Sequence, residues 1–281
     1  MSYRRRRLMN TAMNGVSLLA ALAVTCPLLL IFGFLVYQGV AAINADFVLH
    51  LPKPVGEPGG GVANAIVGSL ILLGLAFCMG LPIGILGGVY LAESRDPRFP
   101  AAVRFLADVL NGIPSIVFGI FAYTLIVLPM RRFSALAGGF ALGLIMVPIV
   151  LRTTEEMVRL IPTSLREAGL GLGLPEWTVT LRVVLPAARA GIITGVIVAM
   201  ARIAGETAPL LFTALGNRFW HHGLDQPIAA LPLQIYAYAI APYDDWHRQA
   251  WAGALVLITL VFVASLTARL ATRRRLVGGP R

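Results

Sequence analysis

The sequence predicts an all-α, polytopic membrane protein with about six transmembrane helices, and three observations support this fold class. Of the 281 residues, 58% are hydrophobic and only 13% are charged, a balance that suits lipid rather than water as the solvent of the fold. Several long stretches lack charged residues, and a helix needs about 20 apolar residues to cross a bilayer. These stretches do not alternate apolar and polar residues as the strands of a membrane barrel do.

Six apolar runs mark the expected spans. The charge-free runs cover residues 8–45, 58–92, 109–130, 133–151 and 249–268. The fifth span in chain order is expected within residues 190–217, although Arg202 and Glu206 lie inside that run. Asn111, Gly112 and Pro114 are expected to break the third run into an interfacial helix and a spanning helix, because proline cannot continue a helix.

The positions of the arginines predict the orientation. Six crossings place both termini on one side of the membrane, together with the connections 93–104 and 152–189. By the positive-inside rule this side is cytoplasmic, because it holds most of the basic residues. They are Arg4 to Arg7, Arg95, Arg98, Arg104, Arg152, Arg159, Arg166, Arg182, Arg189, Arg269, Arg273 to Arg275 and Arg281, against Lys53, Arg131, Arg132, Arg218 and Arg248 opposite. Arg131 and Arg132 fit this topology least well.

These flanking arginines also account for the net charge of +10, so no nucleic acid is expected as a partner. The domain prediction starts with a basic cytoplasmic N-terminus, 1–14, and a first transmembrane helix, 15–40. That helix is expected to remain as an anchor, because its apolar run exceeds the roughly 7–15 residues of a signal-peptide core. A main membrane domain, 60–271, contains a cytoplasmic loop, 158–189, and a cytoplasmic tail follows at 272–281.

Two rows of glycines predict close helix packing within lipid. Gly80, Gly84 and Gly88 recur at four-residue spacing, as do Gly191 and Gly195. Each row lies on one helix face and lets a neighbouring backbone approach closely.

No metal site, cofactor or catalytic residue is predicted. Cys26 and Cys78 lie in separate apolar runs, and the adjacent His221 and His222 lack further ligands at metal-site spacing. An intramembrane enzyme would need a catalytic constellation on its spans, and the sequence offers none. The chain is therefore not expected to be an enzyme.

The loop between the fourth and fifth spans carries the most specific motif. It reads Glu167-Ala168-Gly169, then Gly173, and then Val183, Leu185 and Pro186. With these spacings the sequence resembles the ABC importer permease superfamily, whose members have the type I, MetI-like fold and a conserved "EAA" loop. The departure from the pattern is Gly169 in place of a second alanine. The resemblance implies a cytoplasmic helix-turn-helix that docks into a separate ATPase subunit.

The residues of the loop suit that structure. Pro162 and Ser164 favour a helix start, Ala168 and Gly169 leave a thin surface for close approach, and Gly173 favours a helix end before the proline at position 175. The chain cannot hydrolyse ATP by itself, because its single lysine, Lys53, lies between two prolines and not in a phosphate-binding loop. A partner must supply the ATPase.

Arg202 and Glu206 are the candidates for substrate contact. Four residues apart, they would share one face of a helix. An arginine within a span costs at least about 2.5 to 3.5 kcal/mol on insertion scales, so such residues usually serve a pathway. From chemistry alone, a substrate path and a structural ion pair that locks two helices are equally good readings.

The surrounding sequence resembles a narrower family. The segment 201–214, ARIAGETAPLLFTA, is similar to the signature of the A permeases (PstA) of phosphate-specific Pst importers. The similarity continues through 216–220, 226–228, 231–232 and 250–254. It extends over roughly residues 60 to 270 and is strongest between 152 and 255. The sister C permeases differ after the Gly-Glu-Thr of this signature.

The resemblance implies one permease subunit that forms half of the path for inorganic phosphate in the bacterial inner membrane. It places Arg202, Glu206 and Thr207 on the phosphate path. It assigns coupling to the ATPase to Glu167, Ala168, Gly169, Gly173, Leu185 and Pro186. The implied partners are a sister permease (PstC-like), a dimer of cytoplasmic ATP-binding subunits (PstB-like), a periplasmic phosphate-binding protein (PstS-like) and membrane lipid.

Two points stay open at this stage. A permease for another oxyanion, such as sulfate or molybdate, would share the coupling loop but should lack the signature from Arg202 to Phe212. The sequence also does not decide whether Asp108, Glu155 and Glu156 do more than lie near helix ends.

Overall fold

The computed structural model describes residues 3–54, 57 and 59–277, with side chains described up to Leu270. Parts of the two predicted terminal segments, Met1 and Ser2 and residues 278–281, lie outside the described residues. Within the described ranges the fold is helical, and the one β-type contact is an isolated bridge between Leu215 and Ile228. The all-α fold class is confirmed.

Five helical stretches in the described part of the chain are long and apolar enough to cross a membrane. They are α1 (Tyr3–Val40), α3 (Ala63–Glu93), α7 (Ala135–Arg159), the stretch Glu176–Ala204 and α13 (Asp244–Val277). The sixth predicted span is a bent pair. Its halves, α4 (Arg98–Gly112) and Ser115–Met130, meet at 101° beside Pro114, which confirms the predicted break.

The shorter elements connect these spans. α2 (Ala45–Leu49) follows α1, and Ser115–Met130 consists of α5 (Ser115–Ala122), a π-helical turn η1 (Tyr123–Val127) and α6 (Leu128–Met130). The segment 158–189, which we call the coupling loop, contains α8 (Thr163–Gly171), α9 (Glu176–Val179) and a second π-helical turn, η2 (Thr180–Val184). This turn continues into α10 (Leu185–Ala204). α11 (Ala208–Leu211) and α12 (Leu231–Ala239) precede α13.

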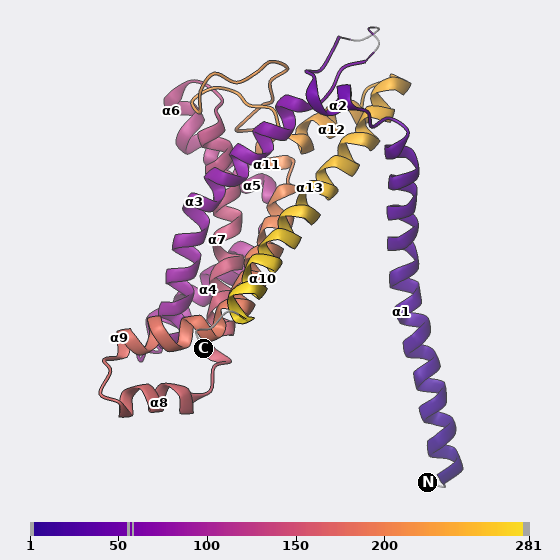
Figure 1. Cartoon of the computed structure of the whole chain (residues 1–281). Helices are drawn as coiled ribbons and strands as arrows, with labels where there is room; N and C mark the ends of the chain where they lie inside the picture. Colours follow the sequence, from indigo (N-terminus) through magenta and orange to yellow (C-terminus); the bar gives the residue numbers. More distant parts are fainter. Residues whose placement is uncertain (1–2, 55–56, 58, 278–281) are drawn as a thin grey trace.

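Figure 1 shows α3, α7, α10 and α13 packed as a bundle, with α8 and α9 at one end. We call this the coupling-loop end. The first residues of α1 and the last of α13 point to the same end, whereas α2, α6 and α12 lie at the opposite end (Figure 1). An even number of crossings, as the sequence predicts, produces this arrangement.

The two glycine rows pack as predicted. A Cβ atom added at Gly84 of α3 would lie 2.7 Å from Val150 Cβ of α7, and one at Gly88 would lie 2.5 Å from Leu151 O. Gly191 and Gly195 of α10 face Met157 and Thr153 of α7 in the same way. Because no side chain separates them, the helix backbones approach closely, which is how helices associate in lipid.

α1 stands apart from the bundle along most of its length (Figure 1). Its contacts with the bundle are at the opposite end, where the rings of Phe34 and Trp251 lie 5.2 Å apart edge to face. Gly39 packs there against Leu255 of α13. Leu35 and Gly39 are the residues of α1 that are buried.

Both π-helical turns lie just before a proline. η1 precedes Pro129 and η2 precedes Pro186, and the residue before each proline donates to a carbonyl five positions earlier. A proline has no N–H to donate and its ring crowds the carbonyl four positions earlier. The wider turn accommodates this clash, so both helices continue through their prolines.

The fifth span ends earlier than predicted. The charge pattern indicated a run to residue 217, but α10 stops at Ala204 and the chain turns at Gly205. Glycine is a poor helix former, and the ring of Pro209 would meet the carbonyl of Gly205 in a continuous helix. The chain therefore reaches the opposite end through α11 and an irregular segment.

That irregular segment, residues 212–230, is fastened to α3 and to the start of α7. Asn64 Nδ2 at the start of α3 donates to Asn217 O at 2.7 Å, and the N–H of Ala135 in α7 donates to Gln226 O at 3.0 Å. Arg132 pairs with Asp225 of the segment at 2.7 Å. This ion pair explains how Arg132 is accommodated at the end that the charge pattern disfavoured.

Candidate functional site

The first candidate site surrounds Arg202 in the last turn of α10. The sequence predicted a guanidinium inside a span, but 48% of the Arg202 side chain is exposed on this chain. The backbone of Arg202 belongs to the span, but its side chain is not buried within this chain. The positive charge suits this position, because the unpaired carbonyls at a helix C-terminus carry partial negative charge.

Glu206 is the acidic neighbour of Arg202, although the two residues do not share a helix face. Glu206 lies in the turn after α10, where its N–H donates to Ile203 O at 3.2 Å. Its carboxylate is 17% exposed and lies 3.8 Å from Arg202 Nε. This separation exceeds hydrogen-bonding distance, so the pair is held by charge and not by a hydrogen bond.

Thr207 begins the short helix α11 and is half-buried. The turn is supported from behind by α5, because Gly119 contacts the backbone of Pro209 and a Cβ atom there would lie 2.6 Å from Pro209 Cα. Thr213 Oγ1 donates to Pro209 O at 2.8 Å. The structure thus brings Arg202, Glu206 and Thr207 together at one break in a membrane helix.

The second candidate site is the coupling loop. α8 ends in a Schellman motif, in which Gly173 N–H donates to Leu170 O at 2.9 Å and Leu174 N–H donates to Gly169 O at 3.4 Å. Gly173 has a φ of +76°, which only glycine adopts without strain. Pro162 precedes α8 and Pro175 precedes α9, so the predicted helix-turn-helix is confirmed.

The motif residues face different ways. Glu167 and Ala168 are exposed on α8, as a docking surface requires. Gly169 is instead buried, and a Cβ atom there would lie 3.0 Å from Val179 Cγ2. The glycine therefore permits packing within the loop and does not thin its outer surface. Leu185 and Pro186 open α10, where Pro186 follows the π-helical turn.

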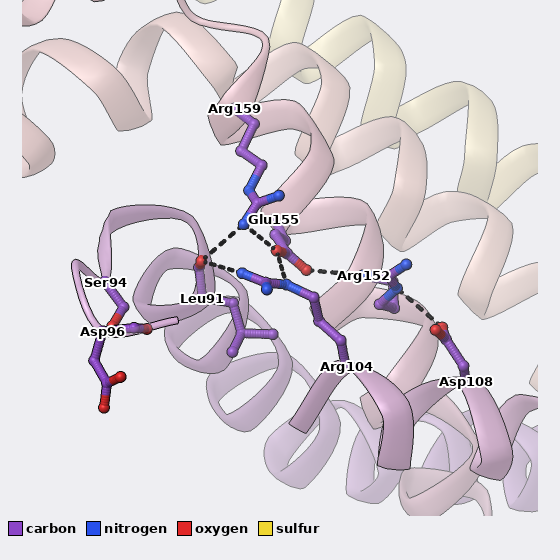
Figure 2. Close-up of polar contacts among 8 residues, drawn as sticks. All are labelled: Leu91, Ser94, Asp96, Arg104, Asp108, Arg152, Glu155 and Arg159. Atoms are coloured by element: carbon purple, nitrogen blue, oxygen red, sulfur yellow. Dashed lines mark hydrogen bonds and ion pairs between the residues drawn. The ribbon is translucent and has the colours of Figure 1, made fainter. Parts of the chain in front are cut away.

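Figure 2 shows a third cluster, which the sequence left undecided, at the junction of α3, α4 and α7. The carboxylate of Glu155 is 2% exposed and is bound by three guanidinium groups. They belong to Arg104 at 2.6 Å, Arg152 at 3.0 Å and Arg159 at 2.9 Å. Arg152 also pairs with Asp108 at 3.1 Å.

The third cluster reaches the last turn of α3 through a backbone atom. Arg104 and Arg159 both donate to Leu91 O, at 3.0 and 3.4 Å (Figure 2). A buried carboxylate needs such partners to offset its lost hydration. Spacing of i, i+3 and i, i+4 within α7 indicates the pairs of Glu155 with Arg152 and Arg159. The contact with Arg104 has no signal of that kind.

Together, these features define a class of protein. The chain crosses the membrane several times, breaks one span beside a half-exposed arginine, and presents an EAA-type loop at one end. These are the features of a transmembrane permease subunit of an ABC importer.

Comparison with known proteins identifies the subgroup. The family described as "Binding-protein-dependent transport system inner membrane component" matches residues 84–277. Proteins named phosphate transport system permease protein PstA are similar along nearly the whole chain. The relative from Xylella fastidiosa is 45% identical over 95% of this chain and 93% of its own length, and that from Haemophilus influenzae is 43% identical over 94% of each. The chain belongs to this transport family and, within it, to the PstA permeases.

Solved structures support the fold independently. A subunit of a bacterial alginate ABC transporter superposes with a TM-score of 0.62, covering 95% of this chain and 98% of that chain at 16% identity. A chain of the MetNI methionine ABC transporter gives a TM-score of 0.60, covering 76% of this chain and 94% of that one at 19% identity. At these identities the comparison concerns the fold alone, which is that of ABC transporter permease subunits. The family match makes the chain a multi-pass inner-membrane permease subunit and not an enzyme.

Proposed function

We propose that this chain forms half of the transmembrane path through which an ATP-driven ABC importer takes up inorganic phosphate. The observation that carries the proposal is the identity of 43–45% along nearly the whole chain to proteins named as phosphate transport permeases. The likeness is not confined to the coupling loop that ABC importers share. The compared range covers 95% of the chain and so includes the turn after α10 where the candidate substrate residues meet.

Arg202 supplies the positive field in this proposal. Its guanidinium is half-exposed and its nearest carboxylate oxygen is 3.8 Å away, so its N–H groups can meet a phosphate that has lost part of its hydration. Guanidinium can donate to two phosphate oxygens at once and stays charged at any physiological pH. Glu206 lowers the local positive potential, which keeps the anion from binding too tightly to leave.

Thr207 contributes a hydroxyl next to this pair, at the start of α11. A hydroxyl can both donate and accept a hydrogen bond, so it suits either protonation state of phosphate. In our proposal these three side chains line one wall of the path. The opposite wall comes from a sister permease of PstC-like type, which would face the exposed side of Arg202.

We assign the remaining partners to the two ends of the molecule. A dimer of PstB-like ATP-binding subunits would dock on the loop 158–189 through Glu167 and Ala168, which are exposed. Gly169, Gly173, Leu185 and Pro186 would set the shape of that loop. A PstS-like periplasmic protein would deliver phosphate to the opposite end.

This arrangement makes the coupling-loop end cytoplasmic, in keeping with its arginine content. The segments 1–14 and 272–281 would then lie in the cytoplasm. Residues 15–40 would anchor the chain in the lipid, and 60–271 would form the transport domain. ATP binding and hydrolysis by the partner would switch the paired permeases between two arrangements, one open to each side.

The substrate assignment is tested by transport. The complete importer, reconstituted in vesicles with ATP on the ATPase side, should take up labelled phosphate and should take up labelled sulfate or molybdate far more slowly. Equal or faster uptake of either competing oxyanion would contradict phosphate as the substrate. Vesicles that contain the importer but receive no binding protein give the background uptake.

A further inference from the structure

Arg166 of α8 makes an ion pair and a hydrogen bond that link this helix to the membrane helices. Its guanidinium pairs with Glu93, the last residue of α3, and donates to Val158 O of α7 at 3.0 Å. Arg166 therefore joins α8 to two spans at once.

The environment of this ion pair distinguishes it from a surface contact. The side chains of Arg166 and Glu93 are 21% and 28% exposed. A second ion pair, Arg95 with Glu176, also links the end of α3 to the loop, but its side chains are 85% and 66% exposed. Exposed ion pairs contribute little because water and salt screen them. The partly buried pair is the stronger link, and the planar guanidinium can hold a carboxylate and a carbonyl together.

The residue that Arg166 holds is close to the Glu155 cluster. Glu93 lies two residues after Leu91, whose carbonyl accepts from Arg104 of α4 and Arg159 of α7 (Figure 2). A force applied to α8 at Arg166 therefore acts on the end of α3, where α4 and α7 are also fastened. α4 leads directly into α5, which supports the turn at Pro209.

We infer that Arg166 is a positioning residue for transport: it makes α3 and α7 follow the coupling loop when the ATPase moves that loop. The inference rests on the proposed function, in which the loop docks on an ATPase. Without Arg166, α8 can move with the ATPase while the membrane helices stay behind. ATP hydrolysis then continues with little phosphate movement.

The experiment compares Arg166→Gln with Arg95→Gln in the complete importer. Phosphate uptake and ATP hydrolysis are measured in the same vesicles, and subunit assembly is measured by co-purification. For Arg166→Gln we expect normal assembly and a ratio of phosphate moved to ATP hydrolysed that is lower by roughly fivefold or more, the low end of typical coupling energies. Arg95→Gln should keep the wild-type ratio, because its ion pair is exposed.

If Arg166→Gln assembles poorly, a variant with the two charges exchanged still tests the inference. Arg166→Glu alone places two carboxylates together, and adding Glu93→Arg restores opposite charges. The double variant should recover part of the ratio lost in the single one. A wild-type ratio in Arg166→Gln, or no recovery in the double variant, would overturn the inference. A wild-type importer that moves a different anion would contradict the proposed substrate, and the ratio would then be measured with that anion.

Discussion

At the scale of single residues, Glu155 is a buried carboxylate with several cationic partners. Its carboxylate is 2% exposed and accepts from three arginines that come from α4 and α7. Removing one member of a buried ion pair lowers stability, because the remaining member keeps its charge without the partner that replaced its hydration. The negative charge of Glu155 thus offsets the repulsion among the three guanidinium groups that surround it.

Glu155→Ala is therefore expected to destabilise the protein by about 1–3 kcal/mol, since it leaves three partly exposed guanidinium groups without the acceptor that they share. The neighbouring Glu156 is exposed, so Glu156→Ala is a matched control with a small expected effect. Thermal unfolding in detergent should show a clearly lower midpoint for Glu155→Ala. Equal midpoints for the two variants would contradict the role assigned to the cluster.

The sequence identified the residues around Arg202 but not their exposure. Residue types and spacing showed that Arg202 and Glu206 are close along the chain. Whether a side chain is covered depends on elements distant in sequence, and Arg202 is half-exposed while Glu206 is mostly covered. The Arg104 contact of Glu155 was invisible for the same reason, because the two residues are 51 positions apart.

At the scale of helices, apolar runs and glycine spacing predicted which segments span and which faces pack. Prolines were less informative. Pro114 marks a bend of 101°, yet Pro27, Pro82 and Pro148 lie inside continuous helices. Membrane helices tolerate proline when neighbouring groups satisfy the freed carbonyls. A proline therefore indicates a weak point in a helix, and packing decides whether the helix ends there.

The support of the Pro209 turn by α5 gives a test at this scale. Gly119→Ala would place a methyl group 2.6 Å from Pro209 Cα, so α5 or the turn must shift. Displacing the turn moves Glu206 and Thr207 relative to Arg202, and about 1.4 kcal/mol of such strain corresponds to a tenfold slower transport step. We expect phosphate uptake to fall by about that factor.

Gly74→Ala is the control for this variant. Gly74 lies in α3, and an added Cβ atom would have no neighbour within 4 Å. Uptake by Gly74→Ala should match that of the wild type. If Gly119→Ala also transported at the wild-type rate, α5 would not position the turn.

At the scale of the whole molecule, one chain does not enclose a path. The exposed side of Arg202 and the separate position of α1 (Figure 1) both leave surface that this chain does not cover. In our proposal, a sister permease covers the side that Arg202 faces. The coupling loop is at one end and the break in α10 lies further along the bundle, so the importer must transmit movement through its helices.

If phosphate passes Arg202, ATP-driven phosphate uptake by the reconstituted importer must depend on that guanidinium. With Arg202→Gln we predict that uptake falls to background while the complex assembles and the ATPase remains active. Arg218→Gln, which removes an exposed arginine from the 212–230 segment, should transport normally. Phosphate uptake at the wild-type rate by the Arg202→Gln importer would show that phosphate crosses without this guanidinium.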